Sequence, residues 1–334
     1  MADYARPGPF AVAVEDGEWR DPARDRRIAW RRYRPQAAGG PSVTRAPLVL
    51  HSHGLGGSRA SGAGWLAHWA SWGIAALAVQ HPGSDASALP SDSPLALRHL
   101  LRSAVDAAQL AARQHDLCFA LDRLTADAPP AMGVSGHSFG AVSALRLIGE
   151  RRGRDHASSA SPGIHAGVSE TKTPAGRAPR ARSVSWEAPD LQVGELHDLP
   201  ADPRLAAAIL FSPSARGGTL PLAERFAGVT VPCLHLTGSR DDGIGPGDIR
   251  AADRCLPFAH MPPPHQHLLV LDGATHPEFA GEFVGDSPGR HVRLLQAAST
   301  AFWLCHLFAD AEAGAWLRNG LPQLLESGDR LLQK

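Results

Sequence analysis

Short runs of apolar residues alternate with segments of helical periodicity along most of the chain. Each run spans four to seven residues and is almost unbroken, which is typical of strands buried on both faces of a parallel sheet. Two strand-like runs joined by a turn-rich segment, 10–14 and 28–33, precede them. Buried strands are expected at 47–51, 74–79, 131–134, 205–211, 232–236 and 268–271.

Helical periodicity marks the segments between these runs, as at Trp65, Trp69 and Trp72, which fall on one helical face. Strands that alternate with helices predict an α/β fold with a mostly parallel central sheet and helices on both faces. In such a sheet, chemistry gathers at the C-terminal ends of the strands. Helices are expected at 65–72, 94–124, 139–148 and 291–308, with a shorter one near Leu321.

The composition changes at residue 151. From there to about residue 200 the chain is rich in Ser, Pro, Gly, Ala and Arg and has few apolar side chains. Such a segment buries too little apolar surface to offset the entropy lost on ordering it. We therefore expect a single domain over residues 1–334 that carries a flexible insert at about 151–200.

The pentapeptide 136–140 reads Gly-His-Ser-Phe-Gly and matches the G-x-S-x-G motif of a nucleophile elbow. It follows an expected strand and opens an expected helix, which is the context the motif requires. The sharp turn strains the backbone at the serine and needs small residues two positions before and after it. It also lifts the hydroxyl out of the sheet near a helix N-terminus. Ser138 is therefore predicted to be a nucleophile.

A serine nucleophile needs a general base, and the chain offers seventeen histidines, so position must discriminate among them. Around such an elbow the chain order is Ser, acid, His, and the histidine follows the last strand. His276 meets this condition. His265 and His267 stand at the wrong end of that strand, and His137 lies inside the elbow, where it should point away from Ser138 Oγ.

The acid that orients the histidine should end the preceding strand. The run from Leu234 to Thr237 leads into Gly-Ser-Arg-Asp-Asp, which ends in Asp241 and Asp242. Either aspartate is placed to reach the histidine loop. Asp272 lies too close to His276 in sequence to replace them.

An oxyanion hole usually supplies two backbone N–H donors. One comes from the residue after the nucleophile, here Phe139, and the other from the loop after the third strand. That loop, 51–59, is rich in glycine, which lets its backbone approach a substrate carbonyl. We assign its donor to the N–H of Leu55. Trp65 and Phe279 are candidates for lining the substrate pocket.

Metal and nucleotide sites are not indicated. His51-x-His53 and His265-x-His267 each place two imidazoles on one face of a strand, without a third ligand at a convincing spacing. His51 and His53 are instead expected to hold their loop by hydrogen bonds. Neither a phosphate-binding G-x-x-x-x-G-K-[ST] nor a strand-to-helix G-x-G-x-x-G is present, so no cofactor is expected.

The formal net charge is zero, which gives no electrostatic reason to expect nucleic acid or an anionic membrane as a partner. No stretch approaches the roughly 18 apolar residues of a membrane span, and the first ten residues lack a signal-peptide pattern. The four cysteines are far apart and are expected to be buried thiols. We therefore expect a cytoplasmic protein acting on a small molecule.

The chain resembles the α/β-hydrolase superfamily, in particular the bacterial predicted dienelactone hydrolases, platelet-activating factor acetylhydrolase and the cutinase-like polyester-degrading enzymes. The resemblance implies carboxylic ester hydrolysis, with Asp241 as the acid beside Ser138 and His276, and with Leu55 and Phe139 as oxyanion donors. It rests on DPARDRRIAWRRYRP (21–35), SHGLGGSR (52–59), VQHPGSDAS (79–87), GHSFGA (136–141), DPRLAAAILFSPS (202–214), TGSRDDGIG (237–245) and GATHPEF (273–279).

True dienelactone hydrolases use a cysteine nucleophile, so Ser138 argues against that substrate. The sequence thus predicts a serine esterase of the α/β-hydrolase fold. Acyl transfer through the same triad and a non-catalytic binding protein on this fold are the alternatives. The sequence does not specify the oligomeric state.

Overall fold

The computed structural model describes residues 2–37, 40, 43, 45–88, 107–153, 198–243, 249–282 and 288–334. Within these residues the chain forms a central sheet in the order β1-β2-β4-β3-β5-β6-β7-β8-β9. The strands from β4 to β8 in this order are parallel, and β1, β2 and β9 pair antiparallel at the two ends. The strands are β1 Ala11–Asp21, β2 Arg26–Gln36, β3 Leu48–Ser52, β4 Ala75–Val79, β5 Met132–His137, β6 Leu205–Phe211, β7 Cys233–Arg240, β8 Gln266–Thr275 and β9 Arg330–Gln333.

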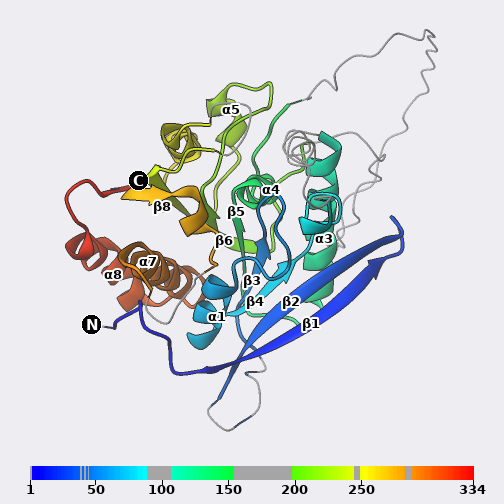
Figure 1. Cartoon of the computed structure of the whole chain (residues 1–334), viewed down its shortest axis with the longest axis horizontal. Coiled ribbons are helices and arrows are strands. Elements are labelled where there is room, and N and C mark those ends of the chain that lie inside the picture. Colours follow the sequence, from blue (N-terminus) through cyan, green and yellow to red (C-terminus); the bar gives the residue numbers. More distant parts are fainter. Residues whose placement is uncertain are drawn as a thin grey trace, which may run out of the picture.

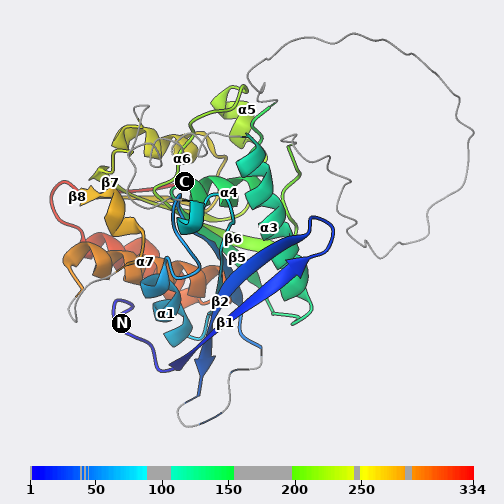
Figure 2. The same cartoon turned by 45° about the vertical axis from the view of Figure 1, so that its right-hand side comes forward.

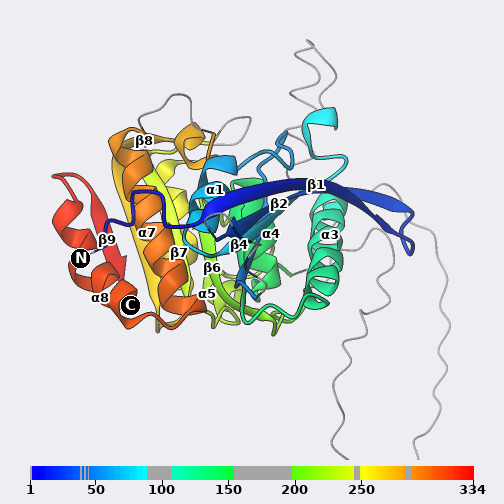
Figure 3. The ribbon, with the colours of Figure 1, turned by 90° about the horizontal axis from the view of Figure 1, so that it is seen from below.

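Helices cover both faces of this sheet (Figures 1 and 3). One face carries α1, α7 and α8, and the other carries α3, α4 and α5. This arrangement is the α/β-hydrolase fold. The helices are α1 Ala63–Ser71, α3 Ala107–Thr125, α4 Phe139–Leu147, α5 Leu222–Phe226, α6 Leu256–His260, α7 Arg290–Leu307 and α8 Ala311–Asn319, with single 3-10 turns η1 Ala86–Ala88, η2 Ala251–Cys255, η3 His276–Phe279 and η4 Leu321–Leu324.

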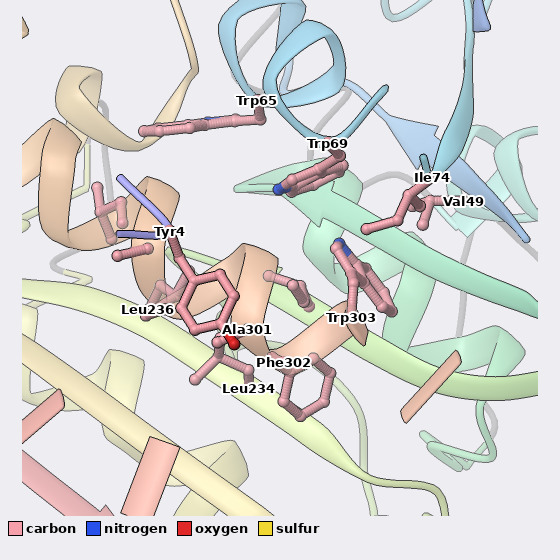
Figure 4. Close-up of a cluster of buried hydrophobic side chains, with 14 of the residues drawn as sticks. Tyr4, Val49, Trp65, Trp69, Ile74, Leu234, Leu236, Ala301, Phe302 and Trp303 are labelled. Carbon is pink, nitrogen blue, oxygen red and sulfur yellow. The ribbon is translucent and has the colours of Figure 1, made fainter. Parts of the chain in front are cut away.

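Two hydrophobic clusters sit on opposite faces of the sheet because successive strand residues point to opposite sides. In β3, Val49 joins the cluster under α1 and α7, whereas Leu48 and Leu50 join the cluster under α3 and α4. Figure 4 shows the first cluster, where the indole rings of Trp69 and Trp303 meet edge to face at 5.7 Å. Apolar side chains on both faces explain why the parallel strands read as unbroken apolar runs.

The expected buried strands are confirmed as β3, β4, β5, β6, β7 and β8. The two preceding runs belong to a much longer hairpin, because β1 and β2 have eleven residues each. Cross-strand ion pairs, such as Arg31 Nε with Asp16 Oδ1 at 2.7 Å, stabilise parts of the hairpin that lack the apolar pattern of a strand. The expected strands did not include β9.

Two sequence predictions fall partly or wholly outside the described residues. The helix expected at 94–124 is seen as α3 from Ala107 onward, and its first part is not described. Of the insert expected at about 151–200, residues 154–197 lie outside the described part of the chain.

The buried histidines predict a loss of stability in acid. Burial lowers the pKa of His51 and of His235 to about 3 and that of His81 to about 4. An unfolded chain takes up these protons already below about pH 6.5, so the folded state is favoured less as the pH falls. Each such histidine should cost about 1.4 kcal/mol of unfolding free energy per pH unit between about pH 6.5 and its folded pKa.

Urea unfolding followed between about pH 7 and pH 4.5 measures this effect. His235 is fully buried beside the ring of Phe258, so His235→Phe should make the decline shallower by up to about 1.4 kcal/mol per pH unit. An unfolding free energy that stays constant over this range would contradict the prediction.

Candidate active site

The turn between β5 and α4 consists of the single residue Ser138. Its backbone has φ 54° and ψ −114°, a conformation that costs a residue other than glycine roughly 1–3 kcal/mol. Its N–H donates to the carbonyl of Phe211, the last residue of β6, at 2.9 Å. Ser138 is partly exposed between two buried neighbours, His137 and Phe139. The hydroxyl therefore stands at the C-terminal edge of the sheet, next to the N-terminus of α4.

The glycines on either side allow this close packing. A Cβ at Gly136 would lie 2.2 Å from the carbonyl oxygen of Gly140, and one at Gly140 would lie 1.9 Å from that of Ser52. Both distances are far inside van der Waals contact, and both neighbouring atoms belong to the backbone. The expectation that the elbow needs small residues on both sides is confirmed.

Asp241 directly follows β7 and is fully buried. Its Oδ1 lies 2.6 Å from His276 Nδ1, and its Oδ2 accepts a hydrogen bond from Thr237 Oγ1 at 2.7 Å. Asp242 is exposed, and its carboxylate instead accepts the N–H of Ala251 at 2.9 Å. Of the two aspartates that the sequence left open, the structure pairs Asp241 with the histidine.

His276 is the first residue of the turn η3, directly after β8. The short contact with Asp241 assigns the Nδ1 proton to that bond and leaves Nε2 as the basic nitrogen. The ring packs against that of His137, with centroids 4.7 Å apart, and His137 precedes Ser138. Among the described residues no hydrogen bond joins Ser138 Oγ to His276. Such bonds often shorten only when a substrate is bound.

A buried arginine that the sequence analysis missed lies beside this pair. Arg254, in the turn η2, places one guanidinium nitrogen 3.2 Å from His276 Nδ1 and another 3.5 Å from Asp241 Oδ1. It also donates to the carbonyls of Ser212, at 2.8 Å, and Asp241, at 3.2 Å. Burial lowers the pKa of Arg254, and the carboxylate of Asp241 opposes that effect. No motif identifies this residue, because it reaches the site from a separate turn.

The loop after β3 lies directly against the elbow. Gly54 is so close to His137 that a Cβ there would lie 3.0 Å from its Nδ1. Gly56 N–H donates to the carbonyl of Ser84 at 2.9 Å, whereas the described residues include no acceptor for the N–H of Leu55. Phe139 begins α4, so its N–H has no acceptor within the helix. Within the described part of the chain, neither of the two predicted donor N–H groups thus has a hydrogen-bond acceptor, and their role as oxyanion donors stays a prediction.

The two predicted pocket residues are in the hydrophobic core. Trp65 and Phe279 are fully buried, and the indole N–H of Trp65 donates to the carbonyl of Phe279 at 3.1 Å. The indole also stacks on the ring of Phe211 at 5.4 Å. The structure thus gives both residues a packing role, and their contribution to a substrate pocket stays a prediction.

His53 bonds within its loop, as expected, whereas His51 lies in β3 and bonds to the neighbouring strand β5. His51 Nδ1 is bonded to Ser135 Oγ at 2.9 Å, and His53 Nδ1 to the carbonyl of Gly54 at 2.6 Å. In the described part of the chain, no three His, Cys, Asp or Glu side chains are grouped to hold a metal ion. None of its helices is long and apolar enough to cross a membrane.

No protein-family model matches the chain, and none of the curated proteins matches it. Solved structures do match. One is described as a PEG-bound complex of a novel cold-adapted esterase from an Arctic intertidal metagenomic library. It is 17% identical, and the match covers 79% of this chain and 86% of that one with a TM-score of 0.49.

The close contact at Gly140 predicts that Gly140→Ala disrupts the elbow. The added methyl group would meet the Ser52 carbonyl, so either β3 or α4 must shift, at a cost of about 1–3 kcal/mol. The urea midpoint measures that loss. Gly289→Ala is the matched control, because a Cβ there meets nothing within 4 Å. Equal midpoints for the two variants would show that the contact at Gly140 relaxes freely.

Proposed function

We propose that this protein is a serine hydrolase that cleaves carboxylic esters, with Ser138 as nucleophile, His276 as general base and Asp241 as the orienting acid. The observation that carries the proposal is the 2.6 Å bond between a fully buried carboxylate and His276, next to a serine held in a strained turn. Each of the three residues follows the C-terminal end of a parallel strand, namely β5, β7 or β8. These are the positions where open α/β sheets carry their chemistry.

In the first half of the reaction, Ser138 Oγ attacks the ester carbonyl carbon while His276 Nε2 takes the hydroxyl proton. Asp241 keeps the Nδ1 proton in place and stabilises the imidazolium that forms. The carbonyl oxygen becomes an oxyanion, which accepts hydrogen bonds from the N–H groups of Leu55 and Phe139. The C–O bond to the alcohol then breaks, and His276 returns the proton to that leaving oxygen.

The acyl group now bound to Ser138 is released by water in a second round. His276 removes a proton from the water as it attacks, the same two N–H groups hold the new oxyanion, and the acid leaves as Ser138 regains its proton. These steps need only groups that the chain supplies. The resemblance of the sequence to the α/β-hydrolase superfamily supports a carboxylic ester as the substrate.

The nucleophile is tested by a fluorophosphonate, which forms a covalent adduct with an activated serine. The probe should label the wild-type protein at Ser138 and leave Ser138→Ala unlabelled. The intact mass and a peptide map of the adduct measure this. Undiminished labelling of Ser138→Ala would show that another residue is the nucleophile.

The acid is tested by the two neighbouring aspartates, which serve as variant and matched control. Asp241→Asn should lower kcat by about 10⁴-fold, since an amide in place of the carboxylate favours the wrong tautomer of His276. Asp242→Asn should change kcat by less than about threefold, because Asp242 only accepts a backbone N–H at the surface. Hydrolysis of p-nitrophenyl butyrate measures both. The reverse ranking would assign the acid to Asp242.

A further inference from the structure

A second buried arginine lies behind the proposed oxyanion hole. Arg113 extends from α3 and is 0% exposed. In Figure 2, α3 stands beside α4, the helix that begins at Phe139. The mechanism above gives Arg113 no role, although burying a guanidinium is costly unless its donors are well bonded.

Three of its hydrogen bonds fix the loop that carries Leu55. Arg113 donates to Ser52 Oγ at 3.1 Å and to the backbone carbonyl of His53 through the same nitrogen. Its other terminal nitrogen donates to Ser84 Oγ at 2.9 Å. The backbone carbonyl of Ser84 in turn accepts the N–H of Gly56, next to Leu55, at 2.9 Å. The guanidinium group of Arg113 is therefore bonded to the chain before Leu55, at Ser52 and His53, and is linked through Ser84 to Gly56, which follows Leu55.

The same side chain also fixes the start of α4. Its Nε donates to Ser143 Oγ at 3.1 Å, and that hydroxyl donates to the carbonyl of Phe139 at 3.0 Å. The guanidinium carbon lies 4.6 Å from the centroid of the Phe139 ring, a cation–π contact. Arg113 is thus in contact with both segments that supply an oxyanion donor.

Two neutral histidines, His53 and His81, add further hydrogen bonds to this network. His53 Nδ1 donates to the carbonyl of Gly54 at 2.6 Å, which leaves Nε2 to accept the N–H of His81 at 3.1 Å. His81 in turn bonds to Ser52 Oγ at 3.0 Å and to the carboxylate of Asp116 at 3.1 Å. Burial lowers the pKa of His53 and of His81, and the charge of Arg113 lowers both further. Both rings are therefore neutral, and each can donate and accept at once.

We propose that Arg113 is a positioning residue for the oxyanion hole: its planar fork sets the distance between the N–H groups of Leu55 and Phe139. The inference rests on the proposed function. Burial lowers the pKa of Arg113 to about 9, so the group is charged at neutral pH. Five donors in one plane span the gap between loop and helix, which a lysine or methionine side chain cannot do. Misplacing such donors by about 1 Å costs roughly 10²-fold in rate.

The test compares Arg113→Met with Arg225→Met. Arg225 is a matched control, since it is also buried, donates to the Glu150 carboxylate and to the carbonyls of Ala215 and Gly217, and packs over the Phe226 ring at 5.4 Å. Active sites are counted by fluorophosphonate titration, so that rates refer to folded protein. The substrate is p-nitrophenyl butyrate.

Arg113→Met should lower kcat per titrated site by about 10²-fold and change KM by less than about threefold, because the oxyanion forms only in the transition state. Arg225→Met should stay within about threefold of wild type in both. An aliphatic trifluoromethyl ketone adds a second readout. Ser138 Oγ adds to its carbonyl carbon, the proton passes to His276, and the oxygen becomes the bound oxyanion. Affinity for this ketone should fall in parallel with kcat/KM.

Arg113→Lys keeps the charge, loses the fork, and covers the case in which the methionine variant does not fold. We expect it to lower kcat by about tenfold with KM unchanged, since only one of the two segments stays bonded. Wild-type kcat and ketone affinity in either Arg113 variant, or an equal fall in Arg225→Met, would overturn the inference. A wild-type protein that no fluorophosphonate labels would instead refute the proposed function itself.

Discussion

The backbone contact between α4 and the end of β3 is the constraint on which the site depends. Gly140 sits so close to the Ser52 carbonyl that no side chain fits between them. That approach brings the first turn of α4 down onto the sheet and holds Ser138 in its strained conformation, with φ 54° and ψ −114°. Strain of this kind persists only where the surroundings fix it, as they do here. The same contact sets the loop after β3 beside the elbow, so a single packing contact positions both the proposed nucleophile and the loop proposed to hold the oxyanion.

Buried charge is the second feature of the site, and two buried arginines supply it at separate positions. Arg254 contacts the pair of Asp241 and His276, whereas Arg113 donates to the carbonyl of His53 in the loop proposed to hold the oxyanion. Three buried histidines near these arginines, His51, His53 and His137, have their pKa values lowered, chiefly by burial. Neutral imidazoles can donate and accept within a region that already holds two guanidinium groups. We therefore expect the fold to be sensitive to acid, because burial disfavours the protonated form of each of these rings.

The sequence predicted the parallel strands and the elbow because each leaves a local signature. An unbroken apolar run needs no knowledge of distant residues, and neither does a glycine two positions from a serine. It did not predict β9, whose four residues are stabilised by pairing with β8 and not by their own pattern. The residue pattern alone left Asp241 and Asp242 open, and only the family resemblance favoured Asp241, since the two differ only in which side chain turns toward His276. Tertiary packing decides that difference.

Arg113 and Arg254 escaped the sequence analysis for a further reason. An isolated arginine in a helix or turn is normally a solvated residue, and nothing near either one marks it as buried. Their roles follow from topology: α3 runs beside α4, and η2 lies beside β7, so each side chain enters the site from behind. In the proposed mechanism the motif residues supply the groups that react, and the proposed role of Arg113, which no motif marks, is to set the distance between two of them. On this view, variants that tune the rate without abolishing it should be sought along α3 and η2 before the motifs themselves.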